Sequence, residues 1–344
     1  MRPVSIVSYG MVTGVGLNAP ASCAAIRCGI NNFQETRFMD KGGEWIIGSE
    51  APLDQPWRGR MKLVKLAAPA IRECLSAAGN VEPEKIPLLL CVSEKTRPGR
   101  LDGLDDQLMN EVQDELGMRF HGRSEVISNG SAGGVEALKH ATALFSQGEA
   151  AYCIIAGVDT FLVVGTLSAY EEKERLLTSN NSNGFIPGEG GASVLVAAGT
   201  QDAGTGMSIA GTGFGREEAT VESEEPLRAD GLVQAIKEAL SASGLTLGNM
   251  DYRTTDINGE QYYFKEASLA LTRILRERKE EFDIWHPADC IGEVGAAIVP
   301  CILGVASAAA RKGYAPGDKV LCHFSNDNGE RAAMILSYSG NGAD

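Results

Sequence analysis

The stretch Ser-Asn-Gly-Ser-Ala-Gly-Gly-Val-Glu-Ala-Leu, residues 128–138, is a turn of small residues between two regular elements. Residues 124–128 (Ser-Glu-Val-Ile-Ser) predict a short strand, and apolar residues from 135 to 145 recur at helical spacing. At such a turn the side chain of Ser131 faces the unpaired N–H groups at the start of the helix, which favour developing negative charge. Glycines are also common in strand-to-helix turns without chemistry, so the turn alone indicates an α/β fold and not yet a site.

The composition is that of a globular protein. The chain has 344 residues, of which 44% are hydrophobic, and this length favours two domains or two fused halves. No stretch approaches the roughly 18 uncharged apolar residues of a membrane span, and the N-terminus lacks the pattern of a signal peptide. We therefore expect a cytoplasmic protein without a membrane partner. The net charge of −14 argues against nucleic acid as a partner, because phosphate binding relies on dense Lys and Arg surfaces.

Eight cysteines are scattered along the chain, with no Cys-x-x-Cys pair, and several lie in apolar runs. This pattern predicts reduced, buried residues. No His or Cys pair has ligand spacing, so no metal and no cofactor are expected. Basic residues gather at two places in the first half and predict either a solvated face or a docking site for an anionic group: Arg58, Arg60, Lys62 and Lys65, and Arg97 with Arg100.

The chain repeats itself. Residues 70–79 (Ala-Ile-Arg-Glu-Cys-Leu-Ser-Ala-Ala-Gly) reappear at 235–244 (Ala-Ile-Lys-Glu-Ala-Leu-Ser-Ala-Ser-Gly) with seven of ten positions identical. Both copies end at a glycine suited to a helix C-cap, and each follows a similar opening strand, at 5–7 and 208–210. We expect a duplicated αβ unit, with halves at residues 1–200 and 205–344 and a seam at 198–206. Alternating strands and helices predict sheets that are covered on both faces.

Several motifs together resemble the β-ketoacyl synthases of the thiolase superfamily. Residues 130–138 resemble that family's nucleophile motif Ala-Cys-Ser-Ser-Gly-x-x-Ala-Leu, and residues 184–192 (Gly-Phe-Ile-Pro-Gly-Glu-Gly-Gly-Ala) resemble its Gly-Phe-x-x-Gly-Glu-Gly-Ala hairpin. Residues 7–16 are similar to its first strand and turn, and residues 148–159 to a later strand. The resemblance implies a thiolase-like five-layer αβαβα body, a homodimer, and a first-half nucleophile that faces two second-half histidines.

The reactive side chains of that family are replaced here. Ser131 stands at the cysteine position, Asn258 at the first histidine and Glu293 at the second. A serine hydroxyl needs a general base where a cysteine thiolate does not. Asn258 cannot take a proton, although its amide can donate a hydrogen bond. An ionised Glu293 would repel an enolate or oxyanion unless its pKa were strongly raised. We therefore expect decarboxylative condensation to be disabled.

One of the four histidines is a candidate base. The segment around His323 aligns beside the family's active-site loop, and a pair of Ser131 and His323, oriented by Glu293 or Asp327, would restore acyl transfer or hydrolysis. His286 is the weaker candidate for the same role. A packed, structural histidine is the alternative for both.

The sequence therefore favours a pseudoenzyme: a ketosynthase-like homodimer that serves as a non-condensing binding, scaffold or partner subunit. Its alternatives are an acyltransferase or thioester hydrolase that acts through Ser131, and an unusual 3-oxoacyl-ACP synthase. The expected partners are a second copy of the chain, an acyl carrier protein, acyl-CoA or another protein. In the family, the strand at 124–128 pairs with its copy across the dimer axis. Residues 262–264 (Tyr-Tyr-Phe) would fill the cavity for an acyl chain, or else simply begin a core helix.

Overall fold

Two five-stranded sheets form the body of the protein in a computed structural model, which describes residues 3–77, 79, 81–199 and 206–340. The strands of the first sheet are β1 (Val4–Thr13), β4 (Leu88–Val92), β5 (Glu125–Ser128), β6 (Tyr152–Thr160) and β7 (Glu189–Ala198). Those of the second are β8 (Gly206–Arg216), β9 (Tyr252–Thr255), β10 (Ile284–Trp285), β11 (Lys319–Ser325) and β12 (Glu330–Ser339). Residues 200–205, in the expected seam, lie outside the described residues, so the proposed boundary between halves stays a prediction.

The two sheets share one topology. The first has the order β1-β7-β6-β4-β5, and the second, read from its first strand, has the order β8-β12-β11-β9-β10. In the first sheet the strands β6, β4 and β5 are parallel, while β7 runs antiparallel to both β1 and β6. The second sheet repeats this pattern, with β11, β9 and β10 parallel and β12 antiparallel to its neighbours. The same αβ unit is thus built twice.

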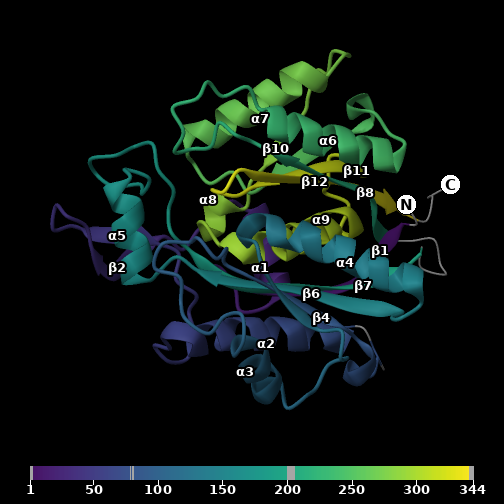
Figure 1. Ribbon diagram of the computed structural model, residues 1–344, viewed down its shortest axis with the longest axis horizontal. Helices are drawn as coiled ribbons and strands as arrows, with labels where there is room; N and C mark the ends of the chain where they lie inside the picture. Colours follow the sequence, from purple (N-terminus) through teal and green to yellow (C-terminus); the bar gives the residue numbers. More distant parts are fainter. Residues whose placement is uncertain (1–2, 78, 80, 200–205, 341–344) are drawn as a thin grey trace.

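Helices complete five layers, which Figure 1 shows from bottom to top as α, β, α, β, α. The helices α2 (Gly59–Ala77) and α3 (Leu108–Leu116) cover the outer face of the first sheet, and α6 (Asp230–Ser243) and α7 (Gln261–Ile274) cover that of the second. Between the sheets lie α4 (Gly133–Gln147) and α9 (Ile298–Arg311), with α1 (Ala19–Arg27) packed beside α9. The expected five-layer α/β fold is confirmed.

The sequence repeat coincides with one packing contact made twice. A Cβ atom at Gly10 of β1 would overlap the carbonyl oxygen of Ala70 in α2, and a Cβ atom at Gly213 of β8 would overlap that of Ala235 in α6. Ala70 and Ala235 are equivalent positions of the repeated segment. Only glycine lets the helix backbone approach its strand so closely. The repeated sequence therefore encodes a repeated helix-on-sheet contact.

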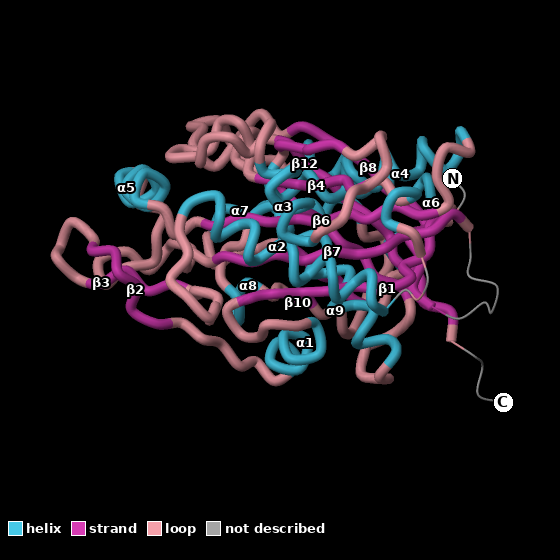
Figure 2. Tube along the Cα trace, turned by 90° about the horizontal axis from the view of Figure 1, so that it is seen from below, coloured by secondary structure: helices cyan, strands magenta, loops and turns pink. Residues whose placement is uncertain are grey.

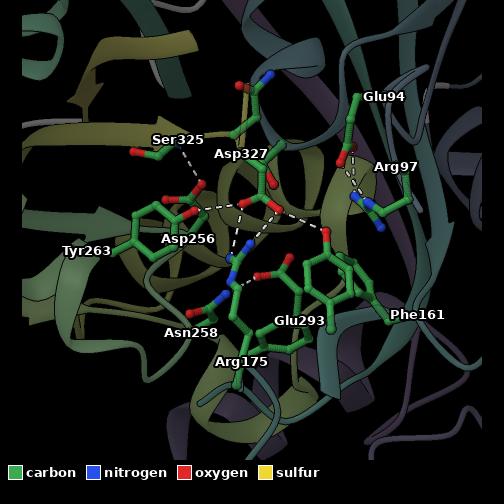
Figure 3. Close-up of a pocket in the computed structure, with 14 residues that line it drawn as sticks. Glu94, Arg97, Phe161, Arg175, Asp256, Asn258, Tyr263, Glu293, Ser325 and Asp327 are labelled. Atoms are coloured by element: carbon green, nitrogen blue, oxygen red, sulfur yellow. Dashed lines mark hydrogen bonds and ion pairs between the residues drawn. The ribbon is translucent and has the colours of Figure 1, made fainter. Parts of the chain in front are cut away.

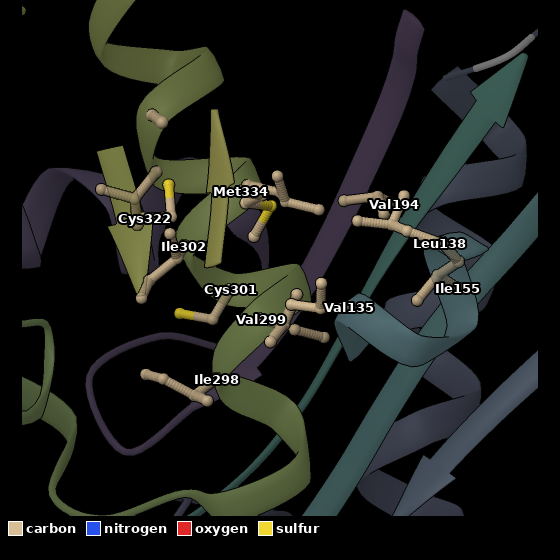
Figure 4. Close-up of a cluster of buried hydrophobic side chains, with 14 of the residues drawn as sticks. Val135, Leu138, Ile155, Val194, Ile298, Val299, Cys301, Ile302, Cys322 and Met334 are labelled. Atoms are coloured by element: carbon tan, nitrogen blue, oxygen red, sulfur yellow. The ribbon is translucent and has the colours of Figure 1, made fainter. Parts of the chain in front are cut away.

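The core lies in the middle layer. Every residue of α9 from Ile298 to Ala309 is buried, as expected for a helix that is apolar on all sides. Its side chains Val299 and Ile302 belong to the same cluster as Val135 of α4 and Met334 of β12, which Figure 4 shows. Both halves thus share one hydrophobic core, and this core holds the N-terminal ends of α4 and α9 in place.

A hairpin and a helix project from one end of the body, as Figure 2 shows. The hairpin consists of β2 (Gln34–Met39) and β3 (Trp45–Gly48), and the helix is α5 (Val164–Glu172). Ile46 of the hairpin packs in a small cluster with Phe161, Tyr170 and Phe185. The short elements that remain are α8 (Ala288–Ile291) and four single 3-10 turns, η1 (Pro83–Lys85), η2 (Gly130–Ala132), η3 (Leu247–Asn249) and η4 (Gly295–Ala297).

Among the described residues, no helix combines the length and apolar character needed to cross a membrane. The eight cysteines are free, and all but Cys28 are buried, as the apolar surroundings predicted. Burial raises the pKa of the Cys74 thiol to about 11 and that of Cys153 to about 12. These two thiols are therefore protonated at neutral pH and unsuited to act as nucleophiles.

Candidate functional site

The turn after β5 forms as expected and places Ser131 at the start of the central helix α4. Gly130 has a φ of 54°, and a Cβ atom there would overlap the carboxylate of Glu94, so only glycine fits. Ser131 follows in η2 and is 9% exposed. Its side chain lines a buried pocket between the two halves of the molecule.

The second half contributes the equivalent turn. Gly295, in η4 just before α9, has a φ of 47°, and a Cβ atom there would overlap the carboxylate of Asp159. η2 and η4 contact each other. The duplicated unit thus brings two glycine turns together. Each turn packs against a buried carboxylate of the first half, that of Glu94 or that of Asp159. The pocket forms where they meet.

The structure brings Asn258 and Glu293 together beside Ser131. The amide Nδ2 of Asn258 donates to Oε2 of Glu293 at 2.6 Å, and Oε1 of Glu293 accepts from the backbone N–H of Gly295 at 2.8 Å. Both side chains line the same pocket as Ser131. Asn258 and Glu293 are labelled in Figure 3. Burial raises the pKa of Glu293 to about 7, although these hydrogen bonds oppose the rise. Asn258, which aligns with the first histidine of the family, is therefore hydrogen-bonded to Glu293, which aligns with the second.

The structure does not bring His323 to this pocket. His323 lies within β11, is buried, and has its Nδ1 atom 3.1 Å from the hydroxyl of Thr255. Burial lowers its pKa to about 3, so the imidazole is neutral. His286 lies near the second-sheet edge with its Nδ1 atom 2.9 Å from Asp289. The described residues that line the pocket include neither a histidine nor a cysteine.

A buried arginine occupies the side of the pocket that faces α5. Arg175 donates through Nε and Nη2 to both carboxylate oxygens of Glu260, at 2.7 and 2.8 Å, and through Nη1 to Asp327 at 2.7 Å. The hydroxyls of Tyr170 and Tyr263 also donate to Asp327, each at 2.8 Å. Burial alone would raise the pKa of Asp327, but Arg175 and these hydrogen bonds hold it below the usual range. We call these five residues the Arg175 cluster; it ties the segment after α5 to the second half. Figure 3 shows Arg175, Asp327 and Tyr263 of this cluster.

A second ion cluster lies on the opposite side of the pocket. Arg97 donates to both carboxylate oxygens of Glu94, at 2.6 and 2.7 Å, and approaches Asp159 at 3.4 Å. Its guanidinium carbon lies 3.9 Å from the ring centroid of Phe161. Burial raises the pKa of Asp159, although Arg97 opposes this. Charged groups that the family motifs do not include thus surround Ser131 on two sides.

One further carboxyl completes the pocket. Asp256 is buried, and its Oδ2 atom accepts from the backbone N–H of Ser325 at 2.8 Å. Burial raises its pKa to about 8. Asp256 and Glu293 are therefore two carboxyl groups that exchange protons near neutral pH within one pocket.

The open space among these groups is small. The cavity measures about 30 Å³, which holds one or two water molecules but not an acyl thioester. The rings of Phe161, Tyr170, Phe185 and Tyr263 take up volume around it. The side chains that line the cavity come from both halves: Glu94, Arg97, Ser131, Phe161, Tyr170, Arg175, Phe185, Asp256, Asn258, Tyr263, Glu293, Ser325, Asn326 and Asp327.

Sequence reasoning missed Arg175, Glu94 and Asp256 as parts of this site. Asp256 could have been found from the sequence, because it lies two residues before Asn258, just after the end of β9. Glu94 and Arg175 lie in loops beside other charged residues and belong to no motif, so their burial was not visible in the sequence.

Apart from Arg58, the basic residues that gather at two places in the first half are paired with carboxylates of the protein. Arg60 bonds to Glu111 at 2.7 Å, Lys65 to Glu115 at 2.6 Å, and Arg100 to Asp105 at 2.8 Å. Lys62 is buried and contacts Glu189 at 2.8 Å. These cations already have acidic partners, so they offer little unpaired charge to an anionic surface.

Comparison with known proteins agrees with this geometry. Residues 98–201, which contain the Ser131 turn and the 184–192 hairpin, match the family described as "Beta-ketoacyl synthase, N-terminal domain". No curated protein sequence matches the chain.

Solved structures extend the likeness to the whole chain. A ketosynthase in complex with its chain length factor from Xenorhabdus doucetiae superposes with a TM-score of 0.80 at 14% identity, over 98% of each chain. The ishigamide ketosynthase/chain length factor gives 0.79 at 16% identity, over 98% of this chain and 100% of that one. A β-ketoacyl synthase from Burkholderia phymatum gives 0.74 at 14% identity, over 98% and 100%. Residues 98–201 thus carry the likeness to the N-terminal domain of β-ketoacyl synthases, and the chain as a whole shares the fold of these ketosynthase structures.

Proposed function

We propose that this protein is a ketosynthase-like binding or partner subunit that does not carry out condensation. The observation that carries the proposal is the small size of the pocket around Ser131. A condensing site must admit a thioester beside its nucleophile, whereas this cavity has room for one or two water molecules.

The charges in the pocket also oppose condensation. That chemistry creates an enolate and an oxyanion, which need hydrogen-bond donors aimed at the developing negative charge. Here the donor groups of Asn258 and Arg175 already bind carboxylates of the same protein. Negative charge that developed beside Ser131 would meet Glu293 and Asp256, which are anionic once deprotonated. The pocket is therefore suited to holding the two halves together rather than to stabilising such a transition state.

The edge position of β5 supports a role in partnership with another chain. Strand β5 lies at the edge of its sheet and is bonded on one side to β4. An edge strand with a free row of backbone groups is a template for pairing with another strand. Two structures of the same fold are a ketosynthase with its chain length factor, so a ketosynthase-like chain of this shape can pair with a related one. We propose that β5 pairs with its copy in a cytoplasmic homodimer, or with the same strand of an active ketosynthase.

The chemical test uses the full chain and a malonyl-loaded acyl carrier protein. We expect no carbon dioxide release above that of a Ser131→Ala control, and intact mass spectrometry should show no acyl adduct after incubation with acyl-CoA or acyl carrier protein thioesters. Carbon dioxide release that disappears in Ser131→Ala would overturn the proposal in favour of a 3-oxoacyl-ACP synthase.

The assembly test is sedimentation over a range of protein concentrations. A homodimer should sediment with twice the chain mass of 36.4 kDa. A species that stays monomeric throughout would contradict the homodimer. The heterodimer form would then be tested by mixing the chain with a ketosynthase and looking for a complex of one chain each.

Acyl transfer or thioester hydrolysis through Ser131 is the second candidate. The observation that favours it is the pair of carboxyls with pKa values near 7 and 8, since a base titrating near neutral pH is the kind that activates a hydroxyl. A single acyl adduct that is absent in Ser131→Ala and in Asp256→Asn would support this function. An adduct that persists in Ser131→Ala would exclude it.

A further inference from the structure

A second cleft lies away from the Ser131 pocket, at the edge of the second sheet. It opens between the C-terminal end of α1, the strand β10 with the start of α8, and the helix α9. Figure 2 shows these elements grouped on one side of the body. The cleft measures about 480 Å³, which is within the range of sites for small organic ligands. The space around Ser131 is far smaller.

The walls of this cleft are apolar and aromatic. Trp285 and Tyr314 supply two rings, and Ile26 and Val305 supply aliphatic surface. Trp285 is held from behind by Tyr252, with ring centroids 4.7 Å apart. A preformed cleft with rigid aromatic walls favours a ligand with a flat, apolar body.

The polar atoms of the cleft are mainly donors. The guanidinium of Arg27 stacks over the ring of Tyr314, with its central carbon 4.2 Å from the ring centroid. Within the described part of the chain, Arg27 makes no ion pair, and neither its guanidinium nor the indole N–H of Trp285 has a hydrogen-bond acceptor. The one carboxylate in the lining, Asp289, is 67% exposed and lies 2.9 Å from His286. An incoming ligand would therefore meet unpaired donors and a free positive charge.

We propose that this cleft binds a small apolar acid, with an aromatic or similarly flat body against Trp285 and Tyr314 and a carboxylate at Arg27. A carboxylate is the group that matches a guanidinium with two parallel hydrogen bonds. The chain carries a net charge of −14, so a carboxylate ligand would be repelled from most of the surface and attracted at this cation. The proposal is independent of any chemistry at Ser131.

The test is calorimetric titration of the full chain with 2-naphthoate and, as the matched neutral probe, 2-naphthamide. We expect saturable one-site binding of the acid and binding of the amide weaker by about tenfold or more, because a hydrogen bond to a charged group is stronger than one to a neutral group. Arg27→Gln should lower the affinity for 2-naphthoate to that for 2-naphthamide. Arg37→Gln is the control, since Arg37 also stacks on a ring, that of Phe38 at 4.9 Å, but lies on the projecting hairpin. It should leave binding unchanged.

A blocking variant tests the location. Ile26 is half-buried in the cleft wall, so Ile26→Trp should fill the cleft and abolish binding of 2-naphthoate while the circular dichroism spectrum stays that of the folded protein. Should this variant not fold, a chain with Trp45 and Trp57 replaced by Phe keeps Trp285 as its single indole, and 2-naphthoate should quench its emission with the midpoint found by calorimetry. Absence of saturable binding, equal binding of acid and amide, or unquenched Trp285 would each overturn the proposal.

Discussion

Replacing Arg175 by alanine should destabilise the protein strongly, because two carboxylates would lose their buried cation. The side chains of Arg175 and Glu260 are 7% and 4% exposed, and Arg175 also bonds to Asp327. Removing one partner of a buried ion pair typically costs about 3–5 kcal/mol, since the remaining charge stays buried without compensation. We expect Arg175→Ala to lower the free energy of unfolding by this amount at pH 8, measured by urea denaturation with circular dichroism.

The matched control is Arg123→Ala. Arg123 also makes two bonds to one carboxylate, that of Glu149, both at 2.6 Å, but its side chain is 57% exposed. Exposed pairs of this kind contribute less than about 1 kcal/mol. A large loss for Arg175→Ala and a small one for Arg123→Ala would show that burial, and not the number of hydrogen bonds, sets the magnitude.

The change of this stability loss with pH also follows from the structure. In the unaltered protein Asp327 has a lowered pKa, so its contribution to stability is present above the unfolded pKa and is lost as the pH falls through the lower, folded value. Without Arg175, burial should raise the pKa of Asp327 and of Glu260, and protonation at low pH would remove the unpaired charges. The difference between the two proteins should therefore shrink from pH 8 to pH 5. A loss below about 1 kcal/mol at pH 8, or one that grows as the pH falls, would refute the reasoning.

Two more predictions concern the repeated contact and the titrating carboxyl. Gly10→Ala and Gly213→Ala should each lower the free energy of unfolding by about 1–3 kcal/mol or more, because the new methyl group meets a helix carbonyl oxygen, whereas Gly122→Ala, with open space at its Cβ position, should be nearly neutral in urea denaturation. A neutral Gly10→Ala together with a neutral Gly213→Ala would contradict the close approach. Burial raises the pKa of Asp256 to about 8, so its contribution to stability is present below the unfolded pKa, about 4, and is lost as the pH rises toward 8. The asparagine side chain of the Asp256→Asn variant does not titrate, so this variant should gain stability relative to the unaltered protein across that interval. A difference in unfolding free energy between the two proteins that does not change with pH would show that this carboxyl has its ordinary pKa.

The duplicated fold could be predicted because its cause is local and repeated. Residues 70–77 of α2 and 235–243 of α6 each lie over a strand that carries a glycine at the contact, so one short pattern specifies the same packing twice. The turn at Ser131 was predictable for the same reason, since its glycines and the flanking periodicities lie within one stretch of chain.

The assembly of the pocket was only partly predictable. The motif alignment proposed that Ser131, Asn258 and Glu293 meet, and the structure places all three on one pocket. The same alignment proposed His323 as a base, but β11 directs that imidazole to Thr255, away from the pocket lining. A motif gives the order of residues along a strand, whereas the register and the face of the strand decide which side chains reach a cavity.

By itself, the sequence determined the repeated αβ pattern, the position of the small-residue turn and the presence of Ser131, Asn258 and Glu293 at the positions that the motif alignment compares, because each of these depends on neighbouring residues. Only the tertiary structure decided that the space beside Ser131 is small. Arg175 and Tyr170 come from the first half, whereas Glu260, Tyr263 and Asp327 come from the second, and they form one cluster only when the shared core packs the halves together. Where charged residues lie far apart in the sequence, the sequence shows neither which of them pair nor which are buried. Folding removes these charges from water, and only then does their pairing contribute strongly to stability.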